Sequence, residues 1–129
     1  MHKFLLSLSL LCSLLLHACG SQAQNKLTPD AFQAALQAAQ NVQLVDVRTP
    51  EEYRSGYIAG AVNINFYDAD FAQQIARLDK AKPLMVYCAV GGRSGKAAAK
   101  LSEMGFKPGT DLAGGMNAWK AASKPVVKE

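Results

Sequence analysis

Residues 84–94 read Leu84-Met85-Val86-Tyr87-Cys88-Ala89-Val90-Gly91-Gly92-Arg93-Ser94. The apolar run at the start predicts a short buried strand, and the alanine-rich segment 94–104 predicts a helix. Cys88 is therefore expected at the carboxyl end of a strand, just before the amino terminus of a helix. Peptide N–H groups gather at such a junction, and their partial positive charge stabilises an anion.

The residue types in this loop suit a reactive thiolate. A cysteine is a nucleophile only as its thiolate, and N–H groups, a helix amino terminus or a cation lower its pKa from about 8.5. Gly91 and Gly92 permit backbone angles that other residues resist, which lets successive N–H groups face one anion. Arg93 can hold a second anionic group with its planar set of donors. The loop therefore predicts sulfur or phosphoryl chemistry.

Strand and helix patterns alternate on both sides of this loop. The expected strands are a brief edge strand at Leu27, residues 42–47, 62–64 and 84–87, and a last one that ends at Leu112. The expected helices follow the cap residues Thr28 and Thr49 and cover 29–40, a turn from Pro50, 70–78, 94–104 before Gly105, and 116–122 after the Gly114-Gly115 bend. Met116 and Trp119 are expected in the core rather than in a substrate pocket.

This alternation predicts an α/β domain whose central, mainly parallel five-stranded sheet is flanked by helices. Ligands in such folds collect at the carboxyl ends of the strands, where both Asp46 and Cys88 fall. The pattern therefore places the reactive loop at the edge of the sheet where a binding site is expected.

Three ordered motifs resemble signatures of the single-domain rhodaneses, the thiosulfate sulfurtransferases. The first is the loop from Cys88 to Ser94. The second runs Leu44-Val45-Asp46-Val47-Arg48-Thr49-Pro50-Glu51-Glu52-Tyr53 and continues through Gly56-Tyr57-Ile58-Ala59-Gly60-Ala61-Val62-Asn63-Ile64. The third is Leu112-Ala113-Gly114-Gly115-Met116-Asn117-Ala118-Trp119. The resemblance implies a rhodanese-like domain over 27–126, with 127–129 as a tail.

The resemblance also implies roles for individual residues. Cys88 is the implied nucleophile, which takes sulfur from thiosulfate or a similar anion as a persulfide and passes it to cyanide, a thiol or a protein acceptor. Asp46, Arg48 and Glu51 are implied mainly to brace the loops near the site, with Asp46 and Arg48 as supporting residues, and of the three Asp46 is the one expected to influence the site. No metal or organic cofactor is implied. The implied substrate-binding residues are Ala89, Val90, Gly91, Gly92, Arg93 and Ser94.

Two other functions stay open at this point. A sulfur-carrier or interaction module would use the same persulfide with little thiosulfate turnover. A phosphatase or arsenate reductase would need oxyanion chemistry at the same loop. In this family a loop of six residues, here Cys88 to Arg93, goes with sulfur, whereas related phosphatases carry one residue more. The loop length therefore favours persulfide chemistry.

The sequence departs from the family pattern at Tyr57 and Ala59, where many relatives carry histidine and proline. The chain's two histidines, His2 and His17, both precede Cys19, so no Cys/His pair is expected in the domain. Activation of Cys88 must then come from loop N–H groups, the helix dipole and Arg93 rather than from an imidazole base.

The amino-terminal residues predict export. Phe4 to Leu16 form an apolar run of 13 residues, too short to span a bilayer, behind a weakly basic tip. Leu16-His17-Ala18-Cys19 resembles a bacterial lipobox, so residues 1–18 are expected to be a signal peptide of the lipoprotein type. Cys19 would carry the lipid, 19–26 would be a tether, and the domain would be periplasmic and held at the membrane. Ordinary cleavage near Ala18 or Ala23 is the alternative.

Cysteine use and charge fit this interpretation. Cys12 would be removed with the signal and Cys19 would be lipidated, which leaves Cys88 as the free thiol without a disulfide partner. The net charge of +4 is mild, and basic runs with interleaved aromatic residues are absent from the sequence. No nucleic-acid partner is therefore expected.

Overall fold

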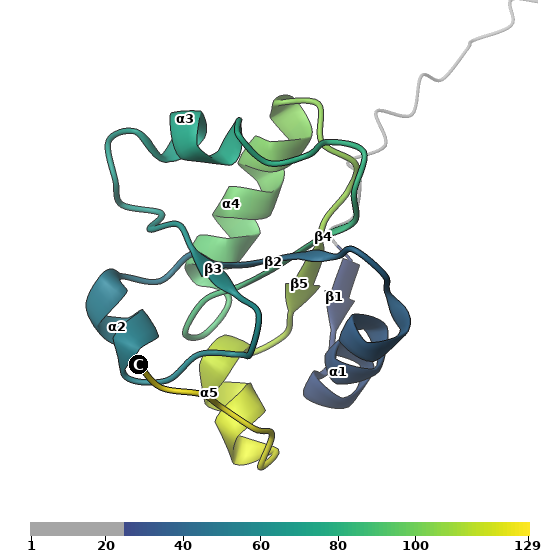
Figure 1. Cartoon of the computed structure of the whole chain (residues 1–129), viewed down its shortest axis with the longest axis vertical. Coiled ribbons are helices and arrows are strands. Elements are labelled where there is room, and N and C mark those ends of the chain that lie inside the picture. Colours follow the sequence, from purple (N-terminus) through teal and green to yellow (C-terminus); the bar gives the residue numbers. More distant parts are fainter. Residues whose placement is uncertain (1–24) are drawn as a thin grey trace, which may run out of the picture.

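The computed structural model describes residues 25–129 as a single α/β unit (Figure 1). The strands are β1 (Asn25–Leu27), β2 (Gln43–Asp46), β3 (Val62–Asn63), β4 (Leu84–Tyr87) and β5 (Thr110–Leu112). They form one five-stranded sheet in the order β1-β5-β4-β2-β3, and every neighbouring pair is parallel. The helices are α1 (Pro29–Ala38), α2 (Pro50–Arg54), α3 (Phe71–Ile75), α4 (Gly92–Glu103) and α5 (Gly115–Ala121). The predicted fold class is confirmed.

Helices cover both faces of the sheet, α3 and α4 on one and α1 and α5 on the other (Figure 1). Alternation along β4 divides the core between them, because successive side chains of a strand point to opposite faces. Leu84, Val86 and Cys88 pack with α3 and α4, whereas Met85 and Tyr87 pack with α1 and α5. As predicted, Met116 and Trp119 are core residues of the second cluster.

Two threonine caps start helices where the sequence predicts them. The Thr28 side chain accepts a hydrogen bond from the Ala31 N–H at the start of α1. Thr49 and Glu52 form a reciprocal capping box at the start of α2, with proline in the first helical turn. Gly105 follows α4 with a φ of 88°, the left-handed conformation that ends helices.

Several predicted helix boundaries differ from the structure: α1 ends at Ala38 rather than at residue 40, and α5 covers Gly115–Ala121 rather than 116–122. The helix α4 begins at Gly92 rather than Ser94, because the turn at Gly91 already supplies a carbonyl that accepts the Gly95 N–H at 3.0 Å. The helix α3 ends at Ile75, and the chain continues to Leu78 in tighter turns, in which the Leu78 N–H bonds to the Ile75 carbonyl.

Both ends of the described domain are tied to the rest of it. β1 begins at Asn25, so the last two residues of the range 19–26 predicted as a tether belong to the sheet. Val127, within the predicted tail, exchanges two backbone hydrogen bonds with Tyr57. The predicted signal peptide and the lipid at Cys19 lie outside the described residues. Among residues 25–129, no helix has the length and apolar character needed to cross a bilayer.

Candidate active site

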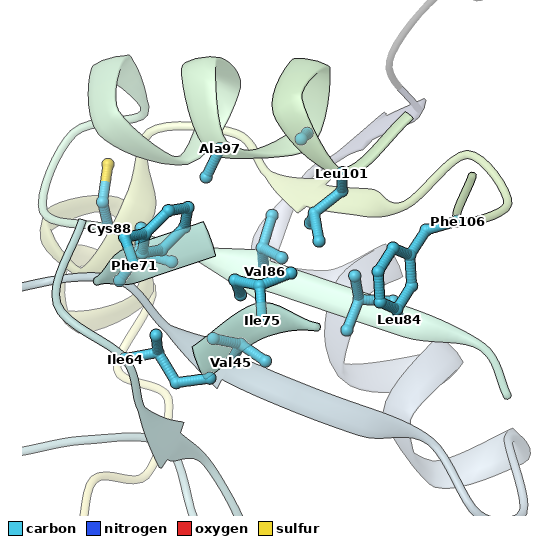
Figure 2. Packing of buried hydrophobic residues seen from close by; sticks show 12 residues of the cluster. Val45, Ile64, Phe71, Ile75, Leu84, Val86, Cys88, Ala97, Leu101 and Phe106 are labelled. Atoms are coloured by element: carbon cyan, nitrogen blue, oxygen red, sulfur yellow. The ribbon is translucent and has the colours of Figure 1, made fainter. Parts of the chain in front are cut away.

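Cys88 follows the last residue of β4 and is fully buried. It belongs to the core cluster under α4, and Figure 2 shows its side chain on the same side of the sheet as Ala97 and Leu101. The parallel partner β2 also ends at this level, since Asp46 pairs with Tyr87. The structure therefore places Cys88 at the carboxyl edge of the sheet, as the sequence predicts.

The loop after Cys88 turns back toward its sulfur. Gly91 has a φ of 112°, a conformation that favours glycine, and its N–H donates to Cys88 Sγ at 3.0 Å. The backbone of Gly92 does not use the conformational freedom that the sequence predicts for it. Gly92 is the first residue of α4, and its φ is not positive. Ser94, fully buried in the first turn of α4, donates through its hydroxyl to Cys88 Sγ at 3.4 Å. The sulfur thus receives both backbone and side-chain hydrogen bonds.

These contacts favour the thiolate. Burial by itself raises the pKa of the Cys88 thiol, because desolvation disfavours the charged form. The Ser94 hydroxyl and the backbone N–H groups of Ser94, Gly91 and Val90 act in the opposite direction and outweigh it, so the net pKa lies below its usual value. The loop therefore activates Cys88 with hydrogen bonds from its own residues.

Arg93 lies beside the loop and is held by Glu52 of α2. Its Nη1 and Nη2 atoms donate to the two Glu52 carboxylate oxygens at 2.7 and 2.9 Å. The guanidinium also lies 5.5 Å from the centre of the Tyr67 ring. The side chains of Arg93 and Glu52 are 17% and 36% exposed, so the pair lies at the surface of the site. Arg93 is thereby fixed in place at the loop and reachable from solvent.

Sequence reasoning missed Glu52 as a site residue. The pattern Thr49-Pro50-Glu51-Glu52 marks a helix start, and Glu52 does accept hydrogen bonds from the Thr49 N–H at 2.9 Å and the Thr49 hydroxyl at 3.2 Å. Its second partner, Arg93, is 41 residues away in the sequence, and a local pattern carries no information on that contact. The available signal was that Glu52 and Arg93 both follow strands whose carboxyl ends meet at one edge of the sheet.

The ion pair lowers the pKa of Glu52 to about 2 from 4.5, chiefly through the hydrogen bonds from Arg93. A depressed carboxyl pKa stabilises the fold above the unfolded value, and this contribution is lost as the pH falls through the folded value. The Glu52 contribution is therefore complete at pH 7 and declines between pH 4.5 and 2.

Glu52→Gln is accordingly expected to lower the free energy of unfolding at pH 7 by about 0.5–1 kcal/mol, the range for a half-exposed pair. The difference from wild type should shrink as the pH falls from 4.5 toward 2. Urea unfolding at pH 7, 4 and 3 measures it. Glu51→Gln is the matched control, because Glu51 is 77% exposed and lies 3.6 Å from Arg54. A difference independent of pH would contradict the electrostatic explanation.

Asp46 and Arg48 form a separate, buried ion pair at 2.7 Å. Arg48 also donates to the Gly56 carbonyl at 2.7 Å, and its guanidinium lies 5.7 Å from the Tyr87 ring centre. Tyr87 belongs to the core cluster on the α1 and α5 face, whereas Cys88 belongs to the other. The pair thus braces the turn after α2, and the Asp46 carboxylate accepts hydrogen bonds from the backbone N–H and the guanidinium of Arg48.

The start of α5 is hydrogen-bonded to the backbone of the loop that begins at Cys88. The Met116 N–H donates to the Cys88 carbonyl at 2.8 Å, and the Asn117 N–H donates to the Ala89 carbonyl at 3.0 Å. Gly115, with a φ of 59°, brings the two backbones together, and a Cβ there would lie 2.6 Å from the Ala89 carbonyl carbon. The sequence indicates a bend at Gly114-Gly115 but not its contact with the loop.

Among the described residues, Cys88 is the one cysteine, and it is a free thiol. No three His, Cys, Asp or Glu side chains within 25–129 gather in a way that could hold a metal ion. The described site presents one cysteine sulfur with hydrogen-bond donors from Gly91 and Ser94 around it.

Known proteins are similar to this chain in sequence and in fold. The chain is 39% identical over 85 residues to thiosulfate sulfurtransferase GlpE of Shewanella oneidensis, an alignment that spans 66% of this chain and 82% of that protein. It is 34% identical over 92 residues to chloroplastic thiosulfate sulfurtransferase 16 of Arabidopsis thaliana, spanning 64% and 77%. The crystal structure of a rhodanese-related protein from Thermoplasma volcanium superposes with a TM-score of 0.72 at 30% identity, covering 81% of this chain and 99% of that one.

The family model described as a rhodanese-like domain matches residues 28–122. This range contains all five helices and the strands from β2 to β5. It includes the loop that surrounds Cys88 and the α5 segment beneath it. The chain therefore belongs to the rhodanese-like domain family.

Proposed function

We propose that this protein is a sulfurtransferase that moves sulfane sulfur from thiosulfate or a similar anion to a thiophilic acceptor through a persulfide on Cys88. The observation that carries the proposal is the pair of hydrogen bonds to the Cys88 sulfur, from the Gly91 N–H at 3.0 Å and the Ser94 hydroxyl at 3.4 Å. Sulfurtransferases among its relatives support the same activity.

The proposed reaction is a double displacement. The Cys88 thiolate attacks the outer sulfur of thiosulfate, a new S–S bond forms, and the bond to the sulfonate sulfur breaks with its electron pair leaving on sulfite. Cyanide or a thiolate then attacks the outer sulfur of the persulfide, the bond to Cys88 breaks, and the thiolate is restored. Neither step needs an external oxidant or reductant, since the sulfur moves between nucleophiles.

The loop residues would stabilise the charge in both steps. The N–H groups of Val90, Gly91 and Ser94, together with the Ser94 hydroxyl, favour the anionic form of the sulfur that alternates between thiolate and persulfide. Val90 contributes to the site through its backbone N–H, whereas its side chain is exposed to solvent. Arg93 would hold the sulfonate and the departing sulfite with the donors that Glu52 leaves unused.

Arg93→Ala is expected to raise KM for thiosulfate roughly tenfold or more, because a charge-assisted hydrogen bond to the substrate is lost. Initial rates of thiocyanate formation over a range of thiosulfate concentrations measure the effect. Arg54→Ala is the matched control, since Arg54 is 57% exposed and pairs with Glu51 on the same helix as Glu52. An unchanged KM in Arg93→Ala would remove Arg93 from thiosulfate binding.

Mass spectrometry of the Cys88 peptide tests the proposal. The full chain is treated with thiosulfate, trapped with iodoacetamide and digested, and a second portion receives cyanide before trapping. We expect the Cys88 peptide to gain one sulfur atom with thiosulfate and to lose it with cyanide. Protein whose thiol is alkylated beforehand is the control. A free Cys88 thiol that gains no sulfur from thiosulfate would overturn the assignment of this donor.

A specific observation favours a second candidate, a sulfur carrier that serves a protein acceptor. Val90 in the loop is 64% exposed, and Tyr67, whose ring lies beside Arg93, is 66% exposed. Large apolar side chains at the mouth of the site suit contact with a protein surface. A persulfide that forms readily but is released slowly to cyanide, and fast to a protein thiol, would support this function.

We further propose that the protein is exported and held at a membrane by a lipid on Cys19. The support is the sequence alone, the apolar run from Phe4 to Leu16 and the Leu16-His17-Ala18-Cys19 motif. Cys19→Ser should release the protein from the membrane fraction of expressing cells, and an unchanged distribution would contradict the anchor.

A further inference from the structure

Two arginines, Arg48 and Arg93, lie near the carboxyl edge of the sheet and differ in how well solvent reaches them. The Arg48 side chain is 4% exposed, and its guanidinium donates to the buried Asp46 carboxylate. The Arg93 side chain is 17% exposed and belongs to the first turn of α4, next to the serine whose hydroxyl donates to Cys88 Sγ. Arg93 is therefore the guanidinium that an anion at the Cys88 loop can reach.

The charge of Arg93 is already matched by Glu52. The two hydrogen bonds to the Glu52 carboxylate, at 2.7 and 2.9 Å, use two of the five N–H groups of the guanidinium. They hold the pKa of Glu52 at about 2, so its carboxylate is charged throughout the neutral range. An arriving anion therefore meets free N–H groups on a pair of residues whose net charge is close to zero.

The effect of Glu52 on a bound anion depends on the charge of that anion. The carboxylate repels an anion at Arg93 with an energy proportional to the charge of the anion. Organic sulfonates and thiosulfonates are singly charged at neutral pH, whereas sulfate and thiosulfate are doubly charged. Both kinds present sulfonate-type oxygens to the remaining N–H groups, so hydrogen bonding does not separate them. Glu52 consequently weakens the binding of the doubly charged anions more.

We propose that Glu52 is a specificity-determining residue, which makes the anion site at Arg93 favour singly charged sulfur anions, such as organic thiosulfonates, over doubly charged ones. The proposal rests on the proposed function, in which the sulfonate end of the sulfur donor binds at Arg93. With a thiosulfonate, the Cys88 thiolate attacks the outer sulfur and forms the persulfide bond. The original S–S bond breaks, and its electron pair leaves on an organic sulfinate in place of sulfite.

Glu52→Gln removes the charge while keeping the local structure. A glutamine side chain retains one oxygen that can accept from Arg93, and glutamine serves as well as glutamate in a capping box with Thr49. Glu51→Gln is the matched control, because it removes the same charge from the neighbouring residue. Glu51 is 77% exposed and lies 3.6 Å from Arg54, away from the Arg93 pair.

The experiment is the protection of Cys88 in the full chain from iodoacetamide by sulfate and by methanesulfonate. The two anions have similar shape, do not react with thiols and differ in charge, and the ionic strength is held constant. Each rate is divided by the rate of the same protein without anion. We expect Glu52→Gln to bind sulfate roughly fourfold to tenfold more tightly and methanesulfonate roughly twofold to threefold. Glu51→Gln should match wild type, and sulfate should not protect Arg93→Ala.

Several results would overturn the proposal. Equal gains for the two anions, or the same gains in Glu51→Gln, would contradict a local selection by charge. Unchanged or weaker sulfate binding in Glu52→Gln would show that Glu52 only orients Arg93. Absence of sulfate protection in both wild type and Glu52→Gln would show that no anion is held at Arg93. The assay contains no sulfur donor, so its failure is distinct from a failure of Cys88 to form a persulfide.

Discussion

Replacement of Cys88 by serine is expected to abolish sulfur transfer, with turnover from thiosulfate to cyanide reduced roughly 10³-fold or more. A serine hydroxyl keeps its proton near neutral pH, so the hydrogen bonds that stabilise a thiolate cannot make it a comparable nucleophile. Serine is similar in size and can still accept from the Gly91 N–H, which donates to the sulfur at 3.0 Å in the wild type. Thiocyanate formation measures the loss.

The control for this variant is the double replacement of Cys12 and Cys19 by serine, which should retain full turnover. Thermal unfolding of Cys88→Ser should remain close to that of wild type, because the side chain stays within the same core cluster. Turnover that survives in Cys88→Ser and disappears in the double variant would place the nucleophile in the amino-terminal segment instead.

Gly115→Ala is expected to destabilise the domain by roughly 3 kcal/mol and to impair Cys88 chemistry at the same time. The new Cβ would overlap the Cys88 carbonyl oxygen and lie 2.6 Å from the carbonyl carbon and oxygen of Ala89. The neighbouring backbone cannot withdraw freely, because Met116 and Asn117 donate to these same two carbonyls. Urea unfolding and the rate of Cys88 alkylation measure the two effects.

Gly60→Ala separates the steric effect from backbone strain. Gly60 also has a positive φ, 86°, but no atom lies within 4 Å of a Cβ built there. It should therefore cost only about 1 kcal/mol, the penalty of a left-handed alanine, and leave Cys88 alkylation unchanged. Equal losses of stability in the two variants would contradict the proposed clash at Gly115.

The fold could be predicted because its signals are local. The strand before Cys88, the threonine caps at Thr28 and Thr49, and the glycine after α4 each depend on residues a few positions apart. Local patterns therefore place the elements with errors of only a few residues at their ends. The parallel order follows from the alternation of strands and helices.

The site was predicted only where it coincides with one loop. Cys88, Gly91 and Ser94 meet because they are close in sequence, whereas the contact of Glu52 with Arg93 depends on tertiary packing. The residue type of Glu52 also offers no distinct pattern, since an acid in a first helical turn is common.

Asp46 illustrates a further limit. It does lie at the same edge of the sheet as Cys88, since it pairs in register with Tyr87. The one-residue offset between Tyr87 and Cys88, however, directs their side chains to opposite faces. The position of a strand end can thus be read from the sequence more easily than the face to which its last residue points.

The hydrogen bonds from α5 to the Cys88 loop couple the motions of these two segments. For the Met116 and Asn117 amides to exchange with deuterium, their bonds to the Cys88 and Ala89 carbonyls must open. The same opening would loosen the peptide that carries the buried sulfur. Amide exchange at the start of the last helix therefore reports how often the thiol becomes accessible, without any reagent that modifies it.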